Sequence, residues 1–188
     1  MGMLPKILIG LAVLLLVFIV VAATRQAAYR VERHLAVAAP AELVFGILND
    51  LHQFARVFVL FGTPWDKLAS SVQKNFDGPA AGVGQSYSWS GKDVGKGSLT
   101  IEETVPGQNV RMTLAFVAPM ASIATCVIAV TGTPTGSLVT WSMAGNHNFI
   151  GKAMGLFMDM DKALGGDIEK SLGQLKTVAE EKAAGAAR

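Results

Sequence analysis

The chain has 188 residues, of which 51% are hydrophobic and 16% are charged, and its formal net charge is +2. This length is enough for one domain with a buried core. The small net charge and the lack of a basic stripe argue against a nucleic-acid partner. The single cysteine, Cys126, excludes an intrachain disulfide, and the three histidines are too far apart to suggest a metal site, so we expect neither metal nor cofactor.

The N-terminal segment reads as a membrane anchor. Residues 7–23 carry no charge. A helix of this length spans about 26 Å and, extended by Leu4 and Pro5, approaches the roughly 30 Å of a bilayer core. The sequence therefore predicts a single-pass transmembrane helix with a short tether, residues 1–28. The alternative is a signal peptide cleaved after the small residues 21–23.

The basic residues around this segment bear on its orientation. Lys6 and the amino terminus precede it, and Arg25, Arg30 and Arg33 follow it. A full count of the basic residues would keep the C-terminal domain in the cytoplasm. Arg30 and Arg33 fall in a predicted strand, however, which leaves Arg25 alone next to the membrane. We therefore predict that the domain lies outside the cytoplasm.

The elements that follow the tether are those of an α+β domain. Residues 29–37 alternate between apolar and polar side chains, as in a strand, and Arg33 breaks the apolar face, which suggests an edge strand. Residues 38–50 predict a helix opened by Pro40. Residues 51–65 predict a short helix and then an irregular, partly exposed apolar loop.

The middle of the chain is a predicted antiparallel meander. Turn residues separate six candidate strands, at 69–76, 84–90, 95–105, 109–117, 122–131 and 137–144. Each strand has one mostly apolar face, which is typical of a sheet covered on one side. The shared faces are Tyr87 with Trp89, then Leu99, Ile101, Glu103 and Val105, and finally Val139, Trp141 and Met143.

The last predicted element is a helix from about Phe149 to Lys182, with a local kink at the Gly165–Gly166 pair. Its apolar stripe includes Met154 and Phe157, and Asp161 falls in the middle of that stripe. The sequence thus predicts a curved seven-stranded antiparallel sheet around a long C-terminal helix, in a domain of residues 29–183 with a frayed tail at 184–188.

Four separated stretches carry a resemblance to a known family. They are YRVERHLAVAAPAELVFGILND, FDGPAAGVGQSYSWSGKDVGKGSLTIEE, VTWSMAGNHNF and MGLFMDMDKALGGDIEKSLGQLK, which lie in order within residues 29–180. In these stretches the chain resembles the SRPBCC superfamily, the START-like or polyketide cyclase/dehydrase-like proteins of helix-grip fold. It is similar to the membrane-anchored bacterial type, which implies the bacterial inner membrane. The region after the first helix departs from the family: Phe54 replaces a tryptophan, and the following turn is Thr63-Pro64-Trp65.

The resemblance implies a cavity for a hydrophobic or amphipathic molecule between the sheet and the last helix. No catalytic motif is common to the whole superfamily. The candidate ligand-binding residues are Tyr87, Trp89, Leu99, Ile101, Trp141, Met143, Met154, Phe157 and Asp161.

Two carboxylates could carry chemistry in such a cavity. A buried Asp161 would have a raised pKa and could donate a proton or a hydrogen bond to a ligand. Otherwise Asp161 pairs with a strand group such as Arg33, or stays wet at the cavity mouth. Glu103 could face Asp161 as an acid/base pair, or it could pair across strands with Arg111.

Three functions follow from these features. The first is a membrane-tethered binding protein for a lipid-like or isoprenoid small molecule, with the lipid bilayer as its other partner. The second is an accessory single-pass subunit that contacts other membrane proteins through the apolar loop RVFVLFGTPW. The third is a cyclase or dehydratase that uses Asp161 and Glu103, and we expect catalysis less than binding.

Overall fold

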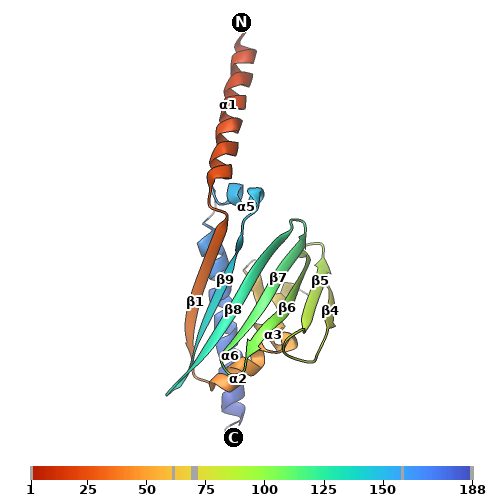
Figure 1. Cartoon of the computed structure of the whole chain (residues 1–188), viewed down its shortest axis with the longest axis vertical. Coiled ribbons are helices and arrows are strands. Elements are labelled where there is room, and N and C mark those ends of the chain that lie inside the picture. Colours follow the sequence, from red (N-terminus) through yellow and green to blue (C-terminus); the bar gives the residue numbers. More distant parts are fainter. Residues whose placement is uncertain (1, 61, 69–71, 158, 187–188) are drawn as a thin grey trace.

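A computed structural model of the protein describes residues 2–60, 62–68, 72–157 and 159–186. The apolar segment forms helix α1 (Met3–Thr24), which projects from one end of the domain with its side chains exposed (Figure 1). Its 22 residues give a length of about 33 Å, close to the thickness of a bilayer core. Within the described residues it is the one helix long and apolar enough to span a membrane.

The domain is built on one antiparallel sheet of seven strands, in the spatial order β1-β9-β8-β7-β6-β5-β4. The strands are β1 (Ala28–Val37), β4 (Gln73–Asp77), β5 (Ser86–Gly91), β6 (Gly95–Val105), β7 (Asn109–Ala118), β8 (Ser122–Thr133) and β9 (Gly136–Asn146). Strands β4 to β9 form the predicted meander, and β1 pairs with β9 at the edge. The first part of the strand predicted at 69–76 lies outside the described residues.

Helices cover one face of this sheet. They are α2 (Ala41–Leu48), α3 (Leu51–Val57), the single-turn α4 (Trp65–Leu68) and the long α6 (Met160–Ala186). Figure 1 shows α6 running along the sheet next to β1 and β9. Its buried side chains, Ile168, Leu172, Leu175 and Ala179, recur every three or four residues and form the helical side of the core. The α+β helix-grip architecture predicted from the sequence is confirmed.

The last helix differs from the prediction because it is interrupted. The short helix α5 (Phe149–Met154) ends at Gly155, and α6 begins five residues later. The Asp159 carboxylate accepts the backbone N–H of Lys162 at 3.1 Å, which satisfies a free donor in the first turn of α6. The break thus precedes Gly165 and Gly166, where we had expected a kink. Helix α6 continues to Ala186, three residues into the predicted tail, and residues 187–188 lie outside the described part of the chain.

The apolar loop after α3 is also different from the expectation, because it is buried. Its residues form a small two-stranded sheet, β2 (Val59–Leu60) with β3 (Thr63–Pro64), against α6. The backbone N–H of Val59 donates to the Ser171 hydroxyl at 2.9 Å. Phe58, Val59, Leu60 and Trp65 are each 8% exposed or less. These four side chains are therefore part of the core, whereas Gly62 is exposed and Phe61 lies outside the described residues.

Candidate ligand-binding site

The covered face of the sheet carries a cluster of aromatic side chains. Tyr87 and Trp89 alternate along β5 and lie on this inner face, as Trp141 does on β9. All three are 4% exposed or less. The ring centroids of Tyr87 and Trp89 are 6.0 Å apart, within the range of favourable aromatic contact.

Three further rings, from the segment between β1 and β4, fill the space over these strands. Phe54 of α3 packs on Trp141 with ring centroids 5.5 Å apart, and Phe58 stacks on the same indole at 6.5 Å. Trp65 of α4 meets Trp89 edge-on at 5.2 Å. The region where the resemblance implied a cavity is therefore occupied by indole, phenol and phenyl rings that pack on one another.

The polar groups of this cluster differ in whether they have a hydrogen-bond partner. The indole N–H of Trp65 donates to the Tyr87 hydroxyl at 2.6 Å, and that of Trp89 donates to the Val94 carbonyl at 3.4 Å. Burial raises the pKa of the Tyr87 hydroxyl, and the hydrogen bond from Trp65 partly opposes this. The indole N–H of Trp141 is shielded from solvent and has no hydrogen-bond partner among the described residues.

The Cys126 thiol, on the neighbouring strand β8, is the other polar group near Trp141. Burial raises the pKa of Cys126 to about 12, and the contact with the Trp141 N–H acts in the opposite direction. This contact falls short of a hydrogen bond in its geometry. Cys126 is therefore an unreactive core thiol, and the Trp141 N–H stays available to another acceptor.

Six of the nine predicted ligand-binding residues lie together on the inner face. They are Tyr87, Trp89, Leu99, Ile101, Trp141 and Met143, each 7% exposed or less. Sequence analysis did not include Phe54, Phe58 and Trp65 in this set. The signal was present in the departure from the family pattern at Phe54 and at the Thr-Pro-Trp turn, but periodicity alone could not show that this segment folds over the sheet.

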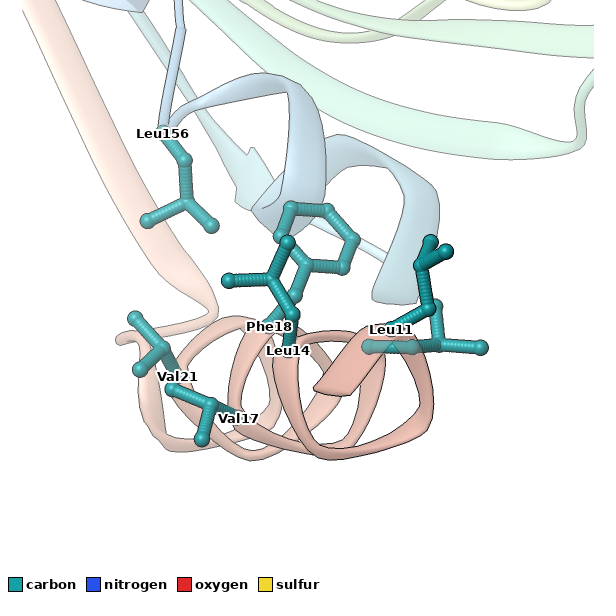
Figure 2. A pocket seen from close by; sticks show the side chains of 7 residues that line it. Leu11, Leu14, Val17, Phe18, Val21 and Leu156 are labelled. Atoms are coloured by element: carbon teal, nitrogen blue, oxygen red, sulfur yellow. The ribbon is translucent and has the colours of Figure 1, made fainter. Parts of the chain in front are cut away.

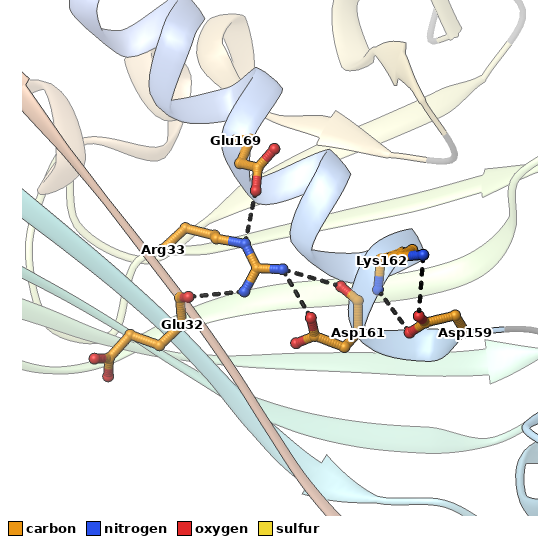
Figure 3. Close-up of polar contacts among 6 residues, drawn as sticks. All are labelled: Glu32, Arg33, Asp159, Asp161, Lys162 and Glu169. Atoms are coloured by element: carbon orange, nitrogen blue, oxygen red, sulfur yellow. Dashed lines mark hydrogen bonds and ion pairs between the residues drawn. The ribbon is translucent and has the colours of Figure 1, made fainter.

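Asp161 lies at the edge of the domain and not in the inner space. Its carboxylate accepts from the Arg33 guanidinium at 2.9 Å, and the Asp161 side chain is 59% exposed (Figure 3). The same guanidinium donates to Glu169 at 2.7 Å. Arg33 on the edge strand β1 thus joins two turns of α6, and this ion pair accounts for a carboxylate on the apolar stripe. The hydrogen bonds that Arg33 donates to Asp161 and Glu169 raise the pKa of Arg33.

Glu103 lies on the outer face of the sheet. It pairs with Arg111 of β7 at 3.2 Å, and its side chain is 61% exposed. The register of β6 against β7 shifts between Ile101 and Glu103. Such a bulge adds a residue to one strand and reverses which side chains face inward. The structure therefore does not bring Glu103 and Asp161 together, and the predicted acid/base pair is wrong.

Met154 and Phe157 lie outside the inner space and are 39% and 79% exposed. Phe157 stacks on Phe18 with ring centroids 6.0 Å apart. Figure 2 shows an open apolar groove of about 520 Å³ at this junction. Its lining comes from α1 and the α5 region and consists of Leu11, Leu14, Leu15, Val17, Phe18, Val21 and Leu156. Across the described residues, no three His, Cys, Asp or Glu side chains come together as a metal site would require.

The fold and the buried aromatic face define a helix-grip domain. A family model described as "Polyketide cyclase / dehydrase and lipid transport" matches residues 28–180. The chain belongs to this family, which confirms the resemblance seen in the sequence. A comparison with curated proteins found no match to the chain.

Solved structures of the same fold extend the comparison. A protein from Chromobacterium violaceum is 18% identical with a TM-score of 0.56, and the match covers 80% of this chain and 96% of that one. Norcoclaurine synthase from Thalictrum flavum, in complex with dopamine and hydroxybenzaldehyde, is 11% identical with a TM-score of 0.59, over 86% and 91%. The di-domain aromatase/cyclase StfQ of steffimycin biosynthesis is 13% identical with a TM-score of 0.58, over 84% of this chain and 52% of that one. At sequence identities this low, the similarity to these structures shows a shared fold only.

Proposed function

We propose that the protein is a membrane-tethered binding protein that holds an apolar or amphipathic small molecule between its sheet and helix α6. Residues 1–28 serve as anchor and tether in the bacterial inner membrane, and residues 29–183 form the binding domain. The apolar length of α1 supports the anchor. The basic residues nearest the membrane, Lys6 before the span and Arg25 after it, favour a domain outside the cytoplasm.

The indole N–H of Trp141 is the observation on which the proposal rests. A buried donor without an acceptor costs about 1–3 kcal/mol, so such groups are rare unless they have a use. A ligand carbonyl or hydroxyl could accept this N–H while its apolar body replaces contacts with Phe54 and Phe58. The bound molecule would therefore combine a mainly apolar body with one polar acceptor, as lipid-like and isoprenoid molecules do.

The neighbours in fold support a small molecule of this kind. The norcoclaurine synthase structure holds dopamine and hydroxybenzaldehyde, two small aromatic molecules, and StfQ is described as an ARO/CYC protein of the steffimycin biosynthetic pathway. Catalysis is not part of our proposal, since Asp161 and Glu103 lie on separate surfaces and each has a cationic partner.

The test compares two buried tryptophans: the indole N–H of Trp65 has an acceptor in the protein, and that of Trp141 has none among the described residues. Purified wild-type, Trp141→Phe and Trp65→Phe proteins are incubated with an organic extract of native membranes, and the retained molecules are identified by mass spectrometry. We expect Trp141→Phe to keep the fold but to lose the ligand. Trp65→Phe leaves the Tyr87 hydroxyl without its donor, so we expect it to keep the ligand and to lose about 1 kcal/mol of stability. Equal retention by all three proteins would contradict the proposed role of Trp141.

A second candidate function is that of an accessory subunit in a membrane protein complex. The open groove between α1 and the α5 region favours it, because another apolar helix could lie there. Within the loop RVFVLFGTPW, residues 57–60 and Trp65 are buried, so these side chains do not contribute to such a contact. Gentle solubilisation from native membranes separates the two ideas: a defined set of co-purifying proteins and no small molecule would favour the subunit.

A further inference from the structure

The exposed apolar side chains of the domain gather at the end that carries α1. Phe149, Ile150, Met154 and Phe157 are between 39% and 79% exposed, and all four belong to one segment, residues 149–157. We call this the α5 segment. Burying four such side chains is worth several kcal/mol, so their exposure to water calls for an explanation.

A second exposed apolar group lies at the β7–β8 turn, which here means residues 117–123, from the end of β7 to the start of β8. Val117 is 67% exposed, Met120 is 38% and Ile123 is 65%. The Asn148 side-chain amide, at the start of the α5 segment, donates to the Ala121 carbonyl of this turn at 3.5 Å. The α5 segment and the β7–β8 turn are therefore neighbours, and together they form the membrane-facing end of the domain.

The other exposed large apolar side chains of the described domain lie elsewhere. Val83 is in the loop between β4 and β5, at the opposite end of β5 from the hairpin that approaches the β7–β8 turn. Leu138 pairs with Ala36 near the end of β1 that is farthest from α1. The exposed apolar side chains are therefore concentrated at the membrane-facing end. Val83 and Leu138 lie away from that end and provide internal controls.

Contacts with α1 fix the level of the α5 segment along the membrane helix. Phe157 stacks on Phe18, and the Lys152 ammonium donates to the Ala23 carbonyl at 3.2 Å, near the end of α1. Six residues separate Phe18 from Thr24, which is about 9 Å along the helix axis. Helices that lie in a membrane interface bury their apolar face by about 5–10 Å. With Thr24 at the membrane surface, Phe157 lies beside Phe18 about 9 Å below that surface, which falls within this range.

We propose that the α5 segment and the β7–β8 turn insert into the bilayer leaflet that holds the C-terminal half of α1, so that the domain sits on the membrane surface. This inference rests on the proposed membrane tether. We expect lipid, and not another protein, to cover these side chains. The apolar surface of the α5 segment is continuous with that of α1, and α1 already lies in the bilayer core if it serves as the membrane anchor. A span with a membrane-docked domain fixes the sheet relative to the bilayer, which a span alone would not do.

Charged residues at this end suit a headgroup region. Lys96 of β6 lies opposite Ala118 of β7 in the strand register, next to the β7–β8 turn. Lys92 and Asp93 lie in the hairpin that connects β5 to β6. Arg25 and Lys152 add two cations next to the apolar side chains, and Asp159, two residues after Phe157, is paired with Lys162. Such cations attract anionic lipid by about 1 kcal/mol each near the surface.

The experiment measures the depth of single labelled positions in the full-length chain. Cysteine replaces Phe157, Ile123 or Val83 and carries an environment-sensitive nitrobenzoxadiazole label. The native Cys126 stays in place, because its buried thiol has a pKa of about 12 and should not react. Each protein is reconstituted into phosphatidylcholine vesicles with a minority of phosphatidylglycerol, with or without nitroxide-labelled lipid. Ile150→Cys replaces Phe157→Cys if the latter does not fold.

We expect labels at 157 and 123 to show blue-shifted emission and several-fold stronger nitroxide quenching than the label at 83. If the protein floats with the vesicles but all labels are quenched alike, docking is wrong and the tether stands. If the labels at 157 and 123 are blue-shifted but escape the nitroxide, protein covers this end and docking is again wrong. If the full chain does not float with vesicles, the tether is wrong and docking falls with it.

Discussion

Gly165 allows an ion-paired arginine to lie directly on helix α6. A Cβ atom at this position would come within 2.1 Å of the nearest Arg33 guanidinium nitrogen. Asp161 and Glu169 lie one turn before and one turn after it and bind the same guanidinium. The two glycines of the pair thus have different roles, because a Cβ at Gly166 would meet no other atom within 4 Å.

This difference predicts unequal effects for two alanine substitutions. Gly166→Ala should stabilise the domain by about 0.5–1 kcal/mol through helix propensity. Gly165→Ala has the same propensity gain but displaces Arg33 from its partners, so it should be less stable than Gly166→Ala by about 1 kcal/mol. Urea unfolding followed by circular dichroism in micelles measures both variants.

The control is the same pair of substitutions in an Arg33→Ala background. Without the guanidinium there is nothing for the new methyl group to displace, so the two alanine variants should become equally stable. A Gly165→Ala protein that already matches Gly166→Ala in the wild-type background would show that the guanidinium does not depend on the glycine.

At the scale of elements, the end of β1 is fastened to α6 through Glu180. Its carboxylate accepts from the Lys176 ammonium at 2.7 Å and from the backbone N–H of Ala38 at 2.8 Å. Lys176 also donates to the Ala36 carbonyl at 3.2 Å. The hydrogen bond from Lys176, and then that from Ala38, hold the pKa of Glu180 below its ordinary value of 4.5.

A pH dependence of stability follows from this lowered pKa. The folded protein binds the Glu180 proton less readily than the unfolded chain does, so the contribution is complete above pH 4.5 and is lost as the pH falls through the lower folded value. Glu180→Gln should therefore lose less stability than wild type between neutral pH and the acid range. Chemical unfolding at a series of pH values gives the comparison, and identical slopes would contradict it.

Elements were predictable from the sequence where their pattern is local. The alternation of Val139, Trp141 and Met143 gave the inner face of β9 correctly, and Arg33 on an apolar face correctly indicated the edge strand β1. Glu103 was misplaced because a bulge changes the register without any local signal.

The break before α6 was missed for a related reason. The apolar period continues through Phe157, whose ring packs on α1 and not on the sheet. The capping role of Asp159 shows itself only once the turn is formed. In the same way, the burial of Phe58 and Trp65 depends on contacts with distant strands, which periodicity cannot show.

At the scale of the whole molecule, α1 meets the rest of the described chain at one end, chiefly through α5 (Figure 1). The core lies entirely within the domain, apart from Ala22. A chain that begins at Arg25 should therefore fold, with a free energy of unfolding close to that of the full chain. It should still associate weakly with anionic vesicles through its membrane-facing end.

Two measurements check the truncated chain. Urea unfolding compares its stability with that of the full-length protein, and vesicle flotation measures its association. A Phe157→Asp version of the same chain is the control and should float less. An unfolded truncated chain would mean that α1 contributes to the fold and is more than an anchor.

The central claim is that one chain combines a retained membrane anchor with a bound small molecule. Native mass spectrometry of the full-length protein, released gently from its own membranes, tests both parts at once. The account predicts the mass of the chain with α1 intact plus one small apolar molecule, and loss of that added mass in Trp141→Phe. A chain shortened near residue 23, or an intact chain without any bound molecule, would contradict it.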